Sequence, residues 1–86
     1  MSDSNFLAEE RDRLLTVRDE LRVQIHLASA EARDLFESLE RDWNRFEGRM
    51  AVLAGVAKAE AADVGDAARL LLDEIKDGYE HLRSQM

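Results

Sequence analysis

The sequence predicts an all-α protein, and three observations support this class. Apolar residues recur every three or four positions from Leu21 to Met86, which is helical spacing. The chain is 36% charged and has no proline or cysteine, as is common in long helices and coiled coils. Aromatic residues make up only 6%, too few for an ordinary β-sandwich core.

The apolar stripe also indicates how the helices pack. Its mean spacing is close to the 3.6 residues per turn of an undistorted helix, so it predicts nearly straight helices rather than a tight supercoil. Flanking apolar residues such as Phe36 and Leu72 make the face wide enough for a bundle of three or four helices. Leu7 and Leu14 extend the stripe upstream less completely, because Glu10 interrupts it. The residues expected to form a core or oligomer interface are Leu21, Ile25, Leu35, Phe36, Leu39, Trp43, Phe46, Met50, Leu53, Val64, Leu71, Ile75, Tyr79 and Leu82.

The expected elements are a long helix followed by a shorter one, together forming a single domain over residues 1–86. Capping residues near Asn5 predict a first helix over about 5–62, and the second is expected over about 66–85. The break is placed at Asp63–Asp66, where Gly65 can end one helix and an aspartate can cap the next. Gly48 and Gly55 are alternative positions for the turn. Since the stripe keeps its phase past Gly65, one continuous or kinked helix remains an alternative.

Charge and composition exclude several classes of function. The net charge of −7 gives no basic surface for nucleic acid and disfavours anionic membranes. The longest apolar run, Met50–Ala57, is far shorter than the roughly 20 residues of a membrane span. The N-terminus has no basic region followed by an apolar run, so no secretory signal is expected. These features predict a soluble, cytoplasmic protein.

No catalytic, cofactor or metal site is expected. The glycines are too far apart for a phosphate-binding loop, and there is no cysteine nucleophile. A di-iron site in a helical bundle uses Glu three residues before His, whereas Val23 precedes His26 and Gly78 precedes His81 at that spacing. We therefore expect a protein that is not an enzyme and holds no cofactor.

Three segments resemble a group of small, mostly uncharacterised bacterial coiled-coil or helical-hairpin proteins. These segments are Glu31-Ala32-Arg33-Asp34, Gly65-Asp66-Ala67-Ala68 and Leu72-Asp73-Glu74-Ile75-Lys76-Asp77-Gly78-Tyr79. The resemblance implies a long charged helix, a Gly-Asp-Ala segment and a shorter amphipathic helix, and it implies no catalytic residues. Relatives in this group often have Trp where this chain has Ala68. The excess of arginine over lysine also suggests a bacterial source.

A two-helix chain of this length would leave part of its apolar face uncovered, which predicts self-association. The simplest closure is a homodimer that forms a coiled coil or four-helix bundle. The expected function is a non-enzymatic structural or protein-interaction module, a scaffold or adaptor, whose partner is itself or another helical protein. The alternative is an amphipathic helix that acts at a lipid surface or in stress protection, which the acidic charge disfavours.

Overall fold

The chain folds into three long helices and one short 3-10 turn, and the described residues include no strand. The computed structural model describes the backbone of residues 3–56 and 58–86 and the side chains of residues 5–56 and 61–86. Helix α1 spans Asp3–Gln24, η1 spans Ile25–Leu27, α2 spans Ala30–Gly55 and α3 spans Lys58–Ser84. The all-α prediction is confirmed, but the number and positions of the helices differ from those expected.

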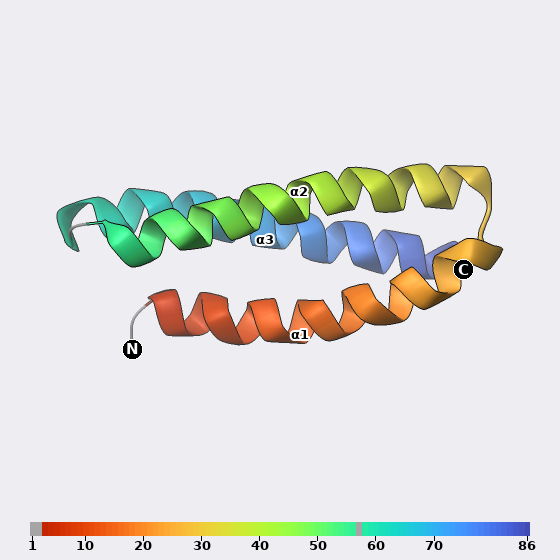
Figure 1. The fold of residues 1–86 in the computed structure, drawn as a ribbon, viewed down its shortest axis with the longest axis horizontal. Coiled ribbons are helices and arrows are strands. Elements are labelled where there is room, and N and C mark those ends of the chain that lie inside the picture. Colours follow the sequence, from red (N-terminus) through yellow and green to blue (C-terminus); the bar gives the residue numbers. More distant parts are fainter. Residues whose placement is uncertain (1–2, 57) are drawn as a thin grey trace.

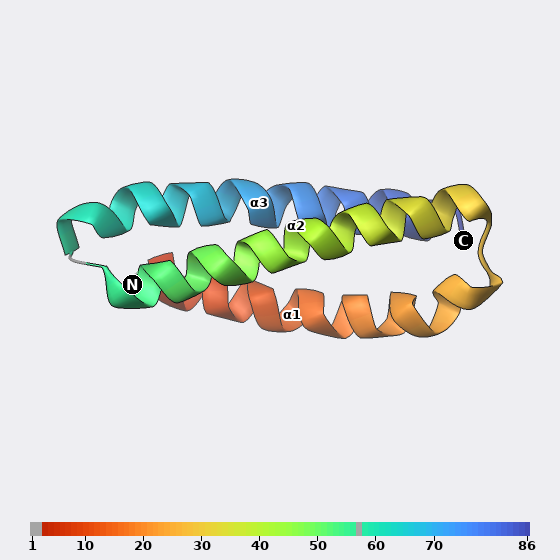
Figure 2. The ribbon, with the colours of Figure 1, turned by 45° about the horizontal axis from the view of Figure 1, so that its top comes forward.

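The three helices lie side by side in an elongated bundle that measures 45 × 19 × 16 Å (Figure 1). Helices α2 and α3 form an antiparallel hairpin (Figures 1 and 2). Helix α1 lies along one side of this hairpin and is antiparallel to α2. The predicted first helix over about 5–62 is therefore wrong, because the chain reverses direction twice instead of once. The apolar stripe keeps its phase through both reversals because helices on either side of a turn face the same core.

The first reversal, between α1 and α2, has no counterpart in the predicted elements. The backbone becomes extended at Ala28 and Ser29, with ψ values of 166° and 163°. The Ser29 hydroxyl then accepts a hydrogen bond of 3.2 Å from the amide of Ala32 and so caps α2. Glu31 adds an acid in the first turn, where the helix dipole favours it.

The second reversal follows Gly55 and not the predicted Asp63–Asp66 segment. Helix α2 ends at Gly55, Val56 is extended, and α3 begins at Lys58. Gly65 is buried and lies inside α3, so it does not end a helix. The break at Asp63–Asp66 and the start of the second helix near residue 66 are therefore wrong. The Gly55 alternative is close to the observed turn, and Ala57 lies outside the described residues.

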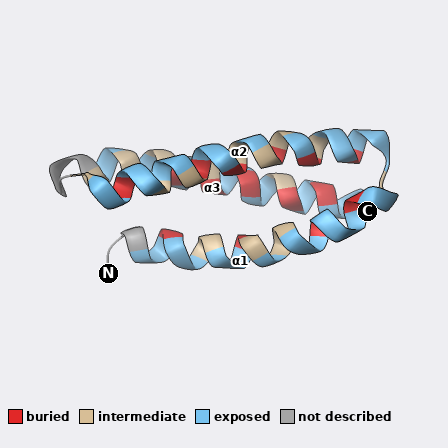
Figure 3. Cartoon of the chain, in the orientation of Figure 1, coloured by how far each residue is buried: buried red, intermediate tan, exposed pale blue. Residues whose placement is uncertain are grey.

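The core runs along the line where the inner faces of the three helices meet (Figure 3). Phe46, Ile75 and Leu82 have no exposed surface, and Trp43 and Tyr79 are almost fully buried. Leu7, Leu14 and Leu21 bring α1 onto this core at intervals of seven residues. Burial of large apolar side chains stabilises the fold by about 1.5–3 kcal/mol each relative to exposure, so this line of contacts holds the bundle together.

A close approach between α2 and α3 sets the register of the hairpin. The side chain of Leu39 lies against the backbone of Gly78, where any added Cβ would collide with it. Glycine lets the two helices come this close because it carries no side chain. In an antiparallel pair, each step forward along α2 then corresponds to one step back along α3, which places Arg45 level with Leu72.

Candidate interaction surface

The structure places most of the residues predicted for a core or interface in the chain's own core. The buried ones are Leu21, Ile25, Phe36, Leu39, Trp43, Phe46, Leu53, Ile75, Tyr79 and Leu82. Leu35, Met50, Val64 and Leu71 are partly buried and pack against this core. Because α1 covers the hairpin, the buried residues are not available to a second copy of the folded chain. The wide apolar face that suggested self-association is closed within one chain.

Among the residues whose side chains are described, five core residues were not predicted, namely Leu7, Leu14, Ala32, Ala68 and Leu72. Leu7 and Leu14 lie on a less complete part of the stripe, because Glu10 interrupts it between them. The seven-residue spacing of Leu7, Leu14 and Leu21 was the signal that marks them as core. The Glu10 carboxylate lies at the edge of the core, where it accepts a 2.7 Å hydrogen bond from Arg13.

Two bidentate ion pairs join α1 to α2 alongside the core. Arg18 donates from Nε and Nη2 to the two carboxylate oxygens of Glu40, at 2.7 and 2.6 Å. Arg11 binds Glu47 in the same way, at 2.5 and 3.1 Å. The Arg18 hydrogen bonds hold the pKa of Glu40 below its usual value, because they stabilise the carboxylate. These pairs fix the rotation of α1 about its own axis.

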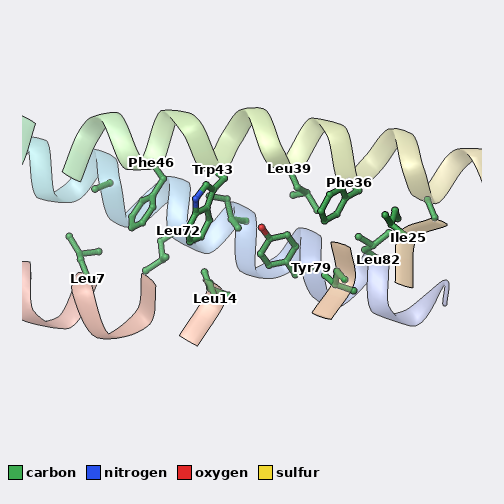
Figure 4. Close-up of a cluster of buried hydrophobic side chains, with 14 of the residues drawn as sticks. Leu7, Leu14, Ile25, Phe36, Leu39, Trp43, Phe46, Leu72, Tyr79 and Leu82 are labelled. Atoms are coloured by element: carbon green, nitrogen blue, oxygen red, sulfur yellow. The ribbon is translucent and has the colours of Figure 1, made fainter. Parts of the chain in front are cut away.

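Aromatic side chains adjoin the ion pair between Arg18 and Glu40. The guanidinium carbon of Arg18 lies 5.6 Å from the centre of the Trp43 ring, within the range of a cation–π contact. The Trp43 and Phe46 rings are 5.7 Å apart and tilted by 50° (Figure 4). The buried hydroxyl of Tyr79 has no hydrogen-bond partner among the described residues, and burial raises the pKa of this phenol.

A small crevice of about 260 Å³ opens between α1 and α3 where Glu10 interrupts the apolar stripe. Leu14, Val17 and Tyr79 form its apolar floor, while Arg13, Lys76 and Arg83 are among the charged residues at its rim. Its lining contains both acidic and basic side chains. Among the described residues, no group of three His, Cys, Asp or Glu side chains is placed to hold a metal ion.

A wide groove of about 720 Å³ lies between α2 and α3. Val52, Ala67, Leu70 and Leu71 line it together with Gly48, Arg45 and Arg49. Leu70 is 67% exposed and Val52 is 48% exposed, although both belong to well-formed helices. Exposed apolar side chains that gather around a groove are typical of a surface that binds another protein.

The helix that forms the α2 side of this groove contains an unusual residue, Gly48. It lies in the interior of α2, where glycine destabilises a helix by about 1 kcal/mol relative to alanine. A Cβ at this position would meet nothing within 4 Å, so no contact with the described residues requires glycine. Gly78, in contrast, is needed for the approach of Leu39. The groove therefore contains a shallow site on α2 that another side chain could occupy.

A second apolar patch lies at the end of the bundle where α1 turns into α2. Val23 and Leu27 are 75% and 94% exposed there. Leu27 lines a shallow pocket together with the exposed Met86. These side chains project from the tip and do not line the α2–α3 groove. They provide a matched comparison for the exposed leucine of the groove.

Comparisons with protein-family models, curated proteins and solved structures find no match to this chain. The resemblance to small bacterial helical proteins therefore stays a prediction. Within the described residues, no helix combines the length and apolarity needed to cross a bilayer.

Proposed function

We propose that this chain is a non-enzymatic protein-interaction module that associates with itself through the α2–α3 groove. The observation that carries the proposal is the exposed apolar lining of the groove, with Leu70 at its centre and Gly48 opposite. A module of this kind acts by presenting a rigid surface, and a three-helix bundle supplies one. Scaffolding or adaptor activity then follows from bringing two copies together.

The size of this face fits a stable dimer. The bundle is 45 Å long and 19 Å wide, so one face offers roughly 800 Å² to a partner. A standard protein–protein interface buries about this area on each side. The original reason for self-association, an uncovered hairpin, does not apply to the three-helix bundle. The proposal rests instead on the groove that remains after α1 has docked.

Sedimentation equilibrium over a range of concentrations tests this proposal. The wild-type chain is expected to form a dimer at micromolar concentration, and Leu70→Asp is expected to be monomeric with unchanged helicity. Leu27→Asp is the matched control, because it makes the same substitution at a more exposed leucine outside the groove. A wild-type chain that stays monomeric, or a loss of association in Leu27→Asp alone, would contradict the proposal.

The lipid-surface alternative makes a different prediction for the same chains. If the apolar groove binds membranes, Leu70→Asp abolishes sedimentation with anionic phospholipid vesicles, whereas the wild type sediments with them. The interaction module is expected to show no binding to vesicles, since the chain is acidic overall.

A further inference from the structure

A row of positive charge runs along the α2 side of the groove. Arg41, Arg45 and Arg49 follow one another at intervals of four residues, so they share one face of the helix, and all three are exposed. Arg45 and Arg49 line the groove directly. Arg45 lies 3.8 Å from Asp42 on the same helix, and no ion pair within the described part of the chain involves Arg41 or Arg49. This arginine row is available to a partner.

A row of negative charge runs along the α3 side. Asp66, Asp73 and Asp77 are exposed. Asp66 lies four residues before Leu70, whereas Asp73 and Asp77 lie three and seven residues after it. These spacings place all three aspartates on the same face of α3 as Leu70, which lines the groove. No ion pair within the described residues involves any of them. The groove therefore separates an arginine row from an aspartate row.

The register of the hairpin puts the two rows at matching heights along the bundle. Since Leu39 lies against Gly78, Arg45 is level with Leu72, the neighbour of Asp73. Arg41 lies one turn before Arg45 on α2 and is therefore near the height of Asp77. Arg49 lies one turn after Arg45 and is near the height of Asp66. Each arginine is thus within about half a helical turn of an aspartate in height, although the groove separates them sideways.

Two copies that meet through this face can be related by a twofold axis along the helices or by one across them. An axis across the helices sets α2 over α2 and α3 over α3, so rows of like charge face each other. An axis along the helices sets α2 of each copy over α3 of the other and keeps every residue at its own height. Only the second arrangement brings each arginine row onto an aspartate row, and like charges across an interface are unfavourable.

The same arrangement explains the mid-helix glycine. Gly48 is level with Arg69, so Leu70 of one copy comes to lie over Gly48 of the second copy. The absence of a side chain at Gly48 leaves room for this leucine, and the twofold axis repeats the contact. Shape and charge thus favour the same pairing.

We propose that the occupant of the groove is a second copy of this chain, related by a twofold axis along the bundle, with the arginine row of each copy on the aspartate row of the other. This inference rests on the proposed function and adds the partner's orientation and the contacts that set it. It requires that association depend on the charge of both rows and on their pairing between chains.

Charge reversal of each row tests the proposal. One variant carries Arg41→Glu, Arg45→Glu and Arg49→Glu, and the other carries Asp66→Arg, Asp73→Arg and Asp77→Arg. Each is expected to dimerise about a hundredfold more weakly than the wild type, because six exposed ion pairs are replaced by repulsions. An equimolar mixture of the two variants is expected to recover wild-type affinity, since opposite rows then face each other across both halves of the interface.

Global charge and helix content are controlled within the same experiment. The aspartate-row variant is closer to neutral than the wild type, so an effect of net charge alone would strengthen its association instead of weakening it. Circular dichroism of each variant and of the mixture shows whether the helices persist. If a single-row variant loses its helices, a variant with only Arg45→Glu and Arg49→Glu, mixed with one carrying only Asp66→Arg and Asp73→Arg, repeats the test.

Salt separates the two orientations independently. Raising NaCl from about 0.1 to 1 M shortens the Debye length from about 10 to 3 Å and screens exposed charges. The proposed pairing predicts weaker wild-type association in high salt, whereas the arrangement with like rows facing each other predicts stronger association. If Leu70→Asp disrupts a dimer that row reversal and salt leave unchanged, the orientation is overturned while the proposed function stands. A wild-type chain that is monomeric throughout overturns both.

Discussion

Two helical glycines in opposite surroundings give a prediction at the scale of single residues. Gly48→Ala is expected to raise the free energy of unfolding by about 0.5–1 kcal/mol, because it improves helix propensity and the new Cβ meets no atom within 4 Å. Gly78→Ala is expected to lower it by about 1 kcal/mol or more, because the new Cβ collides with the buried side chain of Leu39.

Urea denaturation of both variants measures this difference. The measurement is made in a Leu70→Asp background, so that only the stability of the monomer contributes. Equal effects of the two substitutions would contradict the assignment of Gly78 as the close contact and Gly48 as an open position.

At the same scale, the pattern of apolar residues predicted most of the core but not its N-terminal third. Leu7 and Leu14 are buried although a glutamate stands between them at the next stripe position. Glu10 is tolerated there because it binds Arg13 at the edge of the bundle and its side chain is only 15% exposed. One polar residue in a stripe therefore does not show that the stripe has ended, provided that it can reach a partner at the rim.

At the scale of elements, the sequence indicated helices correctly but not where they end. The stripe counts residues that face the core, and antiparallel neighbours face the same core, so its phase does not reveal a turn. The local signals at the first turn were a capping serine at Ser29 and an acid at Glu31, which are weaker than a glycine or proline. Gly65 gave the stronger signal, yet it is buried and lies inside α3. Telling a glycine that ends a helix from one inside a helix requires knowledge of the neighbouring helix.

The attachment of α1 to α2 carries a prediction about pH. Glu40→Gln is expected to lower the free energy of unfolding by about 1–2 kcal/mol at pH 7, because it removes a charge-assisted bidentate pair with Arg18. Arg18 lowers the pKa of Glu40 in the folded state, so this stabilisation is present above the usual value of 4.5 and is lost as the pH falls through the lower, folded value. The difference between wild type and variant is therefore expected to shrink below pH 4.5.

Thermal denaturation from pH 7 to pH 2 measures this difference, and Glu20→Gln is the control. Glu20 binds Arg83 at 3.3 Å, but both side chains are 59% exposed, so its removal is expected to change stability little at any pH. Equal losses in the two variants would show that the Arg18–Glu40 pair has no special role in docking α1.

At the scale of the whole molecule, the expected two-helix dimer and the observed three-helix bundle are two ways of burying the apolar face of a helical hairpin. A hairpin of α2 and α3 has an apolar face that needs a cover, and either a second hairpin or α1 can provide it. Periodicity alone does not distinguish these solutions, because both bury the same stripe. The turn at Ala28 and Ser29 decides between them, since it folds α1 back onto its own hairpin.

Removal of α1 is therefore expected to restore the dimer that a simple hairpin would form. A chain that begins at Ser29 exposes the sides of Trp43, Leu72 and Tyr79 that α1 covers, and this surface should drive two hairpins into a four-helix bundle. This association uses the face opposite the groove, so it should persist in a Leu70→Asp background, where the full-length chain is expected to be monomeric. Sedimentation equilibrium and circular dichroism of the shortened chain check both points. A shortened chain that remains a helical monomer would show that α1 is not the cover of the hairpin, whereas an unfolded chain would show that α2 and α3 depend on α1 even at high concentration.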